Sequence, residues 1–187
     1  MLVSGALWDQ ALSGMVNLTT LRTTDYVVFT KKPVAAISFR LRTLACYCVD
    51  AALADLISGQ DDLEELSTDL GVVEVPKPGS APRLSALRGP ASAIAAVTPG
   101  RPLSHLWFNN DCGVLLDRSE AAAILQGTGQ LTRLRLKARQ LSMLSRTGSI
   151  LAMVEEVIVD QDITWESYIP KVRVIVNASS RVLTPFS

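Results

Sequence analysis

The sequence of 187 residues contains a single histidine, His105. Histidine is the usual general base near neutral pH and a common ligand of zinc, so one chain cannot form a zinc site with two histidine ligands. The three cysteines, Cys46, Cys48 and Cys112, are an odd number, which is not typical of a disulfide framework. Cys46 and Cys48 alone also fall short of four metal ligands. We therefore expect no metal and no cofactor, and we expect this pair to be small buried side chains.

Long apolar runs and complete phosphate-binding loops are also missing. Charged residues between Arg40 and Asp55 interrupt the longest apolar candidate before it reaches the roughly 18 residues of a membrane-spanning helix. The N-terminus contains Asp9 and no early Lys or Arg, which is not typical of a secretory signal. Gly127 and Gly129 lack the third glycine or the lysine of nucleotide-binding loops. The sequence thus predicts a cytoplasmic protein, or a virion protein if it is viral, with no membrane partner.

Charge is scarce as well. Charged residues make up 19% of the chain and hydrophobic residues 48%, whereas roughly 25% charged residues are typical of a globular domain. Depletion of charge marks the centres of buried interfaces, so we expect another chain to cover part of the surface. The length predicts a single domain over 1–187, with a Pro/Gly/Ala-rich surface excursion at about 76–102.

Hydrophobic periodicity predicts strands in much of the chain, with short helices between them. The predicted strands are 26–30, 36–42, 71–75, 104–108, 112–116, 131–139, 149–159 and 170–176, and the predicted helices are 43–57, 61–70 and 119–125. The strands at 104–108 and 112–116 flank Asn109-Asn-Asp111, which is typical of a hairpin. A helix is the alternative at 131–139, because Leu, Arg and Lys are also good helix formers.

These elements predict a strand-rich α+β fold, in which a two-sheet β-sandwich or jelly roll has short helices in its connections. An open antiparallel sheet with helices on one face is the alternative. The order of elements is not the regular βαβ pattern of a doubly wound parallel sheet. No repeat of fixed period is visible, so a solenoid is not expected.

The charges are sorted into blocks along the chain. Eight acids and no base lie between Arg42 and Lys77, and five bases and no acid lie between Glu120 and Glu155. If 131–139 is a strand, four of these bases lie on one face roughly 6 to 7 Å apart, which is close to the spacing of successive phosphates. No aromatic residue interleaves with them along the chain. The four bases are Arg133, Arg135, Lys137 and Arg139, and they face solvent, another subunit or a nucleic acid.

The leading functional hypothesis is a structural subunit of a homo-oligomeric assembly, such as a small viral or phage coat or tail component. Its partners would be copies of itself. The strand-rich pattern, the low charge, the sorted charges and the lack of a catalytic constellation support it. One alternative is a nucleic-acid-binding module that uses the basic strand at 131–139. A second alternative is a cysteine-dependent enzyme in which His105 activates Cys112, although the sequence as a whole does not predict an enzyme.

Overall fold

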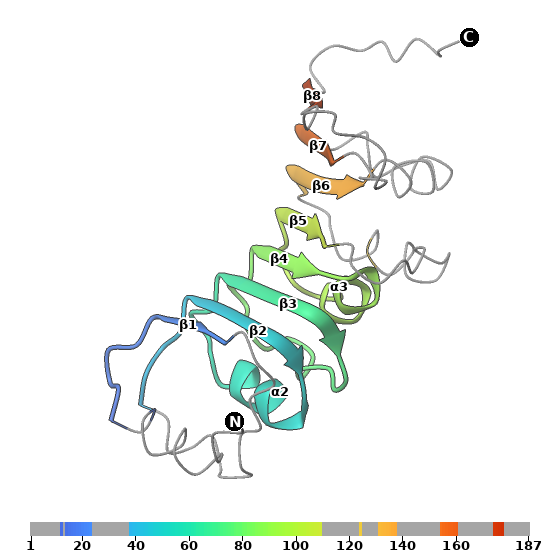
Figure 1. The fold of residues 1–187 in the computed structure, drawn as a ribbon. Coiled ribbons are helices and arrows are strands. Elements are labelled where there is room, and N and C mark those ends of the chain that lie inside the picture. The colour runs from blue at the N-terminus through green and yellow to red at the C-terminus, as the bar shows by residue number, and fades with distance from the viewer. Residues whose placement is uncertain are drawn as a thin grey trace, which may run out of the picture.

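The computed structural model describes residues 12, 14–23, 38–109, 124, 131–137, 154–160 and 174–177. Strands dominate this part of the chain, and two short helices accompany them (Figure 1). In chain order the elements are β1 (Thr20–Arg22), β2 (Thr43–Val49), α2 (Ala51–Ser58), β3 (Glu65–Val72), β4 (Ala86–Gly89), α3 (Ala91–Val97), β5 (His105–Phe108), β6 (Arg133–Lys137), β7 (Glu156–Asp160) and β8 (Val174–Asn177).

The strands form one sheet, and their order across the sheet is their order along the chain (Figure 1). Each strand from β1 to β6 pairs in parallel with the next one, and β8 pairs antiparallel with β7. Parallel neighbours cannot be joined by a tight turn, so each connection must carry the chain back along the sheet. The chain therefore advances across the sheet one strand at a time, without reversal.

This single sheet overturns the predicted two-sheet β-sandwich or jelly roll, and the antiparallel alternative is also wrong. The protein is an α/β protein with seven parallel strands and an antiparallel eighth. The predicted hairpin illustrates why the fold class was wrong. Its first strand is present as β5, but the described neighbours of β5 are β4 and β6, and both run parallel to it. Alternating polarity indicates a half-buried strand and does not indicate the direction of its partners. The described structure gives no support to the capsid or virion interpretation.

A Leu-x-x-Leu motif recurs at the start of successive strands. The second leucine of each copy lies beside that of the next strand, 19 to 28 residues further along the chain. The first positions are Leu18, Leu41, Leu63, Leu84, Leu103, Leu131 and Val154, and the second are Leu21, Leu44, Leu66, Leu87, Leu106, Leu134 and Val157. All are buried except Leu18, which is partly buried against the same core. The chain thus contains an internal repeat, and its uneven spacing conceals it.

Hydrogen bonds at the residue after the first leucine connect each repeat to the one before it. The main-chain N–H of Ser104 donates to the carbonyl of Ser85 at 2.8 Å, and that of Thr132 donates to the carbonyl of Ser104 at 2.9 Å. The hydroxyls of Ser104 and Thr132 donate to the same two carbonyls, each at 3.2 Å. A polar position beside a buried leucine therefore continues the hydrogen-bond ladder beyond the strands.

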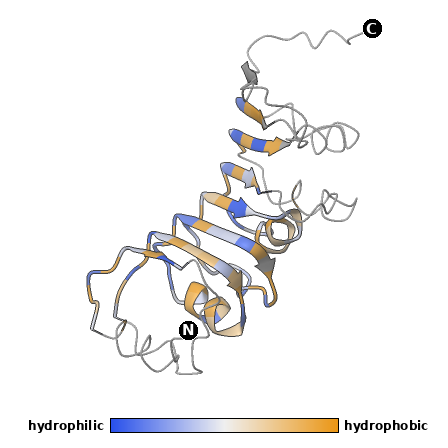
Figure 2. Cartoon of the chain, in the orientation of Figure 1, coloured by the Kyte–Doolittle hydropathy of each residue, from blue (hydrophilic) through white to orange (hydrophobic). Residues whose placement is uncertain are grey.

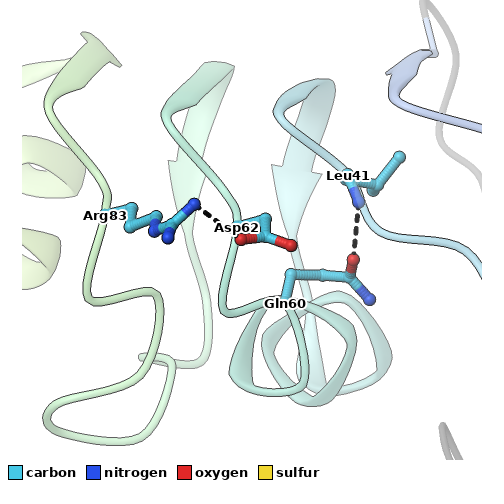
Figure 3. A network of polar contacts seen from close by, with 4 residues as sticks. All are labelled: Leu41, Gln60, Asp62 and Arg83. Carbon is cyan, nitrogen blue, oxygen red and sulfur yellow. Dashed lines mark hydrogen bonds and ion pairs between the residues drawn. The ribbon is translucent and has the colours of Figure 1, made fainter.

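Two side-chain contacts in the connections join further pairs of repeats (Figure 3). The Oε1 atom of Gln60 accepts a hydrogen bond of 2.7 Å from the main-chain N–H of Leu41, and both residues are buried. The guanidinium of Arg83 forms an ion pair of 2.9 Å with Asp62, where both side chains are largely exposed. The two contacts differ in burial, and this difference sets their expected contribution to stability.

One face of the sheet is buried, and both helices lie on that side of it (Figure 1). Helix α2 begins after Asp50, whose carboxylate accepts a hydrogen bond of 2.9 Å from the N–H of Leu53 and so caps the helix. Helix α3 is rich in alanine and buries Ile94 beside β3, β4 and β5. The small alanine side chains allow this helix to pack close to the strands.

Alternation within the strands separates the buried face from the open one. In β6, Leu134 and Leu136 are buried, whereas Arg133 and Arg135 are exposed. Figure 2 shows the same alternation of hydrophilic and hydrophobic residues along β6. The predicted strand at 131–139 is therefore confirmed over Arg133–Lys137, and the helical alternative is wrong there.

Two of the predicted helices are largely replaced by strands. β2 occupies the first half of the helix predicted at 43–57, and only α2 remains helical. β3 occupies most of the helix predicted at 61–70. Both strands have a parallel neighbour on each side, and this pairing overrides the local helical preference. Residues 38–42, predicted as strand, have no regular structure.

The segment at 76–102 contributes β4 and α3 to the fold, with buried Leu84 and Leu87. Predicted strands at 149–159 and 170–176 overlap β7 and β8. The strands predicted at 26–30 and 112–116 lie outside the described residues, as does the helix predicted at 119–125 apart from Ile124.

Candidate functional site

The open face of the sheet carries the two residues that flank the second leucine of each repeat, because neighbours of an inward-facing strand residue point outward. Strand register arranges them in two rows that cross the sheet. The first row is Thr20, Thr43, Glu65, Ala86, His105, Arg133 and Glu156, and the second row is Arg22, Ala45, Ser67, Arg88, Trp107, Arg135 and Ile158. Residues that are far apart in sequence thus become neighbours about 4.8 Å apart on one surface.

Basic and aromatic side chains meet at the centre of the second row. Trp107 of β5 is the register partner of Arg88 on β4 and of Arg135 on β6. Arg88 and Arg135 are exposed, and Trp107 is partly buried. The aromatic residue that does not interleave with bases along the sequence is therefore placed between two arginines across the strands.

Arg133 has a different electrostatic setting from Arg88. Its Nε atom lies 3.0 Å from a carboxylate oxygen of Glu156 on β7, so its charge is partly compensated. Among the predicted contact residues, Arg133 and Arg135 do share the open face. Lys137 continues β6, and Arg139 lies outside the described residues. The predicted contact role of these four bases stays a prediction.

A hollow of about 260 Å³ lies on the open face over β1 to β5. Small residues, among them Ala45, Ser67 and Ala86, line its middle, and larger side chains, among them Arg22, Glu65, Arg88 and Trp107, line it as well. Register places Ala45 and Ser67 in the second row between the two arginines, so the depression exists because short side chains separate long ones. "The hollow" hereafter means this set of residues.

The hollow contains two guanidiniums without a carboxylate partner. Arg22 and Arg88 are both exposed, and neither forms an ion pair with another residue of the described part. Glu65 accepts a hydrogen bond of 3.4 Å from the hydroxyl of Thr43 in the same row. The hollow therefore has more positive than negative charge, and its two guanidiniums form no ion pair within the described residues.

The predicted cysteine–histidine pair gains no support from the described geometry. Cys112 lies outside the described residues, and Nδ1 of His105 lies 2.8 Å from the hydroxyl oxygen of Ser104. That hydroxyl donates its proton to the carbonyl of Ser85 at 3.2 Å.

The thiols of β2 are poor nucleophiles. Burial, the largest cause, raises the pKa of Cys46 to about 12 together with the neighbouring Cys48, Asp69 and Asp50. Burial also raises the pKa of Cys48, with a smaller effect from Asp50. Within the described ranges, no group of three or more His, Cys, Asp or Glu side chains could hold a metal ion. The expectation that this pair is buried is confirmed for Cys46, whereas Cys48 is only partly buried.

The acidic stretch from Asp50 to Glu74 does not form one patch. Asp50 caps α2, Asp62 pairs with Arg83 in a connection and Glu65 lies on the open face. Each repeat consists of a strand followed by a helix or loop that leads back to the start of the next strand. Acidic residues that are close in sequence therefore lie on different sides of the molecule. Charge blocks in the sequence were therefore a poor guide to surface patches.

Arg101 is a buried cation whose contacts join two parts of the fold. It is 4% exposed, and its guanidinium donates to the carbonyls of Lys77 and Ser80, both at 3.2 Å, and to that of Val97 in α3. Burial lowers its pKa. These contacts hold the loop before β4 against the end of α3.

The sequence-based prediction of contact residues did not include Arg22, Glu65, Arg88 and Trp107. Each flanks the second leucine of a Leu-x-x-Leu motif, and this was the signal that could have found them. Aligning the motif copies places Arg88, Trp107 and Arg135 at the same position of consecutive repeats. If the repeat is not recognised, nothing in the sequence indicates that these distant residues are neighbours on the sheet.

The fold defines a class: single-sheet α/β proteins built from parallel-strand repeats, with a leucine-lined face that is buried and a polar face that is open. No protein-family model matches the chain, no curated protein matches it and no solved structure matches it. In the part of the chain that the structure describes, no helix is long and apolar enough to cross a membrane.

Proposed function

We propose that this protein is a non-catalytic binding module that holds a segment of a partner protein against its open sheet face. The observation that carries the proposal is the second row, in which Arg88, Trp107 and Arg135 lie side by side on exposed strands. Arg and Trp are the residue types most enriched among energetically dominant interface positions. Both described helices lie on the opposite side of the sheet and leave this face open (Figure 1).

The repeat architecture supports a binding role. Solenoid proteins stack short repeats and use the resulting extended surface for recognition. The Leu-x-x-Leu spacing and the one strand per repeat are similar to those of leucine-rich solenoids, whose strands line a binding surface. Each repeat then contributes a pair of outward side chains, and together these pairs compose the contact surface.

Mixed charge on the open face favours a protein partner over a nucleic acid. Glu65 lies before Arg88 and Glu156 lies after Arg133, so acids interrupt the basic positions. A chain of phosphates requires a groove of one sign, whereas a polypeptide can offer both signs. A segment with acidic and apolar residues matches this surface best.

The proposal is tested by selecting random linear peptides, displayed on phage, against the immobilised full chain. We expect the selected peptides to lose about tenfold or more of their affinity for the Trp107→Ala variant, because a central aromatic anchor is removed. The matched control is Arg83→Gln, whose side chain lies in a connection away from the open face. Equal binding by Trp107→Ala and the wild type would show that the peptides do not use this face.

Single-stranded nucleic acid is the second candidate, because Trp107 between two arginines provides a stacking surface flanked by bases. Binding of a fluorescent oligothymidylate is measured between about 50 and 200 mM salt, where phosphate contacts weaken steeply. Salt-sensitive binding that Arg135→Glu abolishes, together with failure of the peptide selection, would favour this candidate.

A further inference from the structure

We infer that the hollow receives an acidic side chain of the bound segment, a carboxylate or a phosphorylated hydroxyl, between Arg22 and Arg88. This inference rests on the proposed function and names the chemistry that the open face recognises. Three features carry it: two guanidiniums that form no ion pair with a described residue, short side chains between them, and an aromatic wall at Trp107.

The shape of the hollow admits one side chain. Arg22 on β1 and Arg88 on β4 occupy the same row three strand steps apart, which corresponds to about 14 Å between their backbones. The two positions between them are Ala45 and Ser67. Because these residues are short, the long arginine side chains can turn inward above them and approach one group from both sides.

The charge of the hollow selects an anion. Arg133 has a carboxylate partner in Glu156, whereas Arg22 and Arg88 form no ion pair with any described residue. Glu65 accepts a hydrogen bond from Thr43 and belongs to the first row. It therefore repels an anion in the second row from one side only. An anionic group in the second row is therefore attracted by two cations, and charge-assisted, bidentate hydrogen bonds from arginine favour carboxylate and phosphoryl oxygens.

Trp107 adds an apolar wall to this anion site. A side chain that carries an acid on an apolar stem can place the stem against the indole while the acid meets the guanidiniums. Glu65 disfavours a continuous chain of phosphates across the hollow, and a single acidic group avoids that carboxylate. An acidic residue within a peptide therefore fits better than a nucleic acid.

The first experiment examines the hollow without any peptide. The indole N–H resonance of Trp107, assigned with Trp107→Phe, is followed while phenyl phosphate, benzoate or neutral benzamide is added to the full chain. We expect saturable shifts with one or both anions and none with benzamide. Arg22→Gln/Arg88→Gln should abolish the shift, and Arg83→Gln, which removes one positive charge in a connection, should preserve it. No saturable shift, or equal shifts in the double variant, would overturn the inference.

The second experiment uses the selected peptides in three forms: with their acid, with the corresponding amide, and with phosphoserine at the same position. Replacement of the acid by the amide should weaken binding about tenfold or more, and Arg88→Gln should then cause little further loss, because both changes remove one contact. Stronger binding of the phosphoserine form than of the acid form would identify a phosphorylated partner, and the reverse order an acidic one. Either order supports the site.

The two proposals fail in different ways. If the small anions bind through Arg22 and Arg88 but no peptide is selected, the hollow is an anion site and the proposed function is wrong. If peptides bind through Trp107 while Arg22→Gln/Arg88→Gln has no effect, the proposed function stands and this inference is wrong.

Discussion

At the residue scale, burial decides what a polar contact contributes, and the two contacts in Figure 3 make this measurable. Gln60 is 2% exposed and accepts from a main-chain N–H at a residue with no exposed surface, Leu41. The ion pair of Arg83 with Asp62 has side chains 65% and 41% exposed. Water can replace the second contact when it is lost, but it cannot easily reach the first.

We expect Gln60→Leu to lower the free energy of unfolding by about 1–3 kcal/mol, because the N–H of Leu41 then lacks its partner. Arg83→Met should lower it by about 0–1 kcal/mol, as exposed ion pairs do. Urea denaturation followed by circular dichroism measures both. Equal losses in the two variants would contradict a larger contribution from the buried contact of Gln60 with Leu41.

The thiol of Cys46 gives a prediction about pH. Its pKa is raised from 9.0 to about 12 in the folded chain, so above pH 9 the unfolded thiol loses its proton while the folded thiol keeps it. The unfolded state then binds fewer protons, and stability falls as pH rises from about 9 toward 12. Cys46→Ala should therefore lose less stability than the wild type over this range. Parallel stability curves for the two proteins would contradict the raised pKa.

Reactivity checks the same thiol independently. At pH 8 iodoacetamide should modify Cys46 slowly in the folded chain and rapidly in denaturant, with peptide mass spectrometry identifying the site. Cys48 serves as an internal comparison, because it is less buried and its pKa is raised as well.

At the scale of elements, β4 and α3 approach each other closely at Gly89. A Cβ atom at this position would lie 3.0 Å from Cγ2 of Thr68 and 3.4 Å from the Cβ of Ala93. Thr68 has no exposed surface, so its methyl group cannot move into solvent. The glycine therefore permits the strand to pack against β3 and the following helix.

We expect Gly89→Ala to lower the free energy of unfolding by about 1–3 kcal/mol through overpacking. Thr68→Ser removes the nearest methyl group and keeps the hydroxyl, so the double variant should be more stable than the sum of the single effects implies. A thermal or urea double-mutant cycle measures this coupling. Strict additivity would show that the contact with Thr68 is not the cause.

The elements also show what sequence reasoning could reach. β6 was predictable because Leu134 and Leu136 alternate cleanly with Arg133 and Arg135. β2 was not, because its register shifts between Cys46 and Cys48 and so breaks the alternation. The helical preference of the acids before β3 misled the prediction at 61–70, where pairing with two neighbours decides the structure.

The site was predictable only in part for a related reason. Arg133 and Arg135 stand close together in sequence and were identified as contact candidates. Arg88 and Trp107 join them through strand register, which requires knowing that the sheet is parallel and in chain order. The variable repeat length, from 19 to 28 residues, removed the periodic signal that would have shown this.

At the scale of the whole molecule, the low charge content predicts self-association, and an exposed apolar group supports it. Leu70, Val73 and Val75 at and beyond the end of β3 are 49%, 77% and 52% exposed. Light scattering should give a mass above 20.2 kDa, and Val73→Asp should lower it by adding charge to this group. If the basic strand contributes to the contact, the mass should also fall with ionic strength. A monomer under every condition would remove the hypothesis of a homo-oligomeric subunit.

The chain-order sheet also determines how the molecule would respond to force. Among the described strands, each inner strand pairs with the strands of the two adjacent repeats, and β1 and β8 pair with one strand each. Stability is then close to a sum of local terms, as in other one-dimensional arrays. Pulled apart through β1 and β8, the sheet would lose its strands from the ends inward, in successive steps of one repeat. Extension would rise as a staircase whose step lengths follow the unequal repeats.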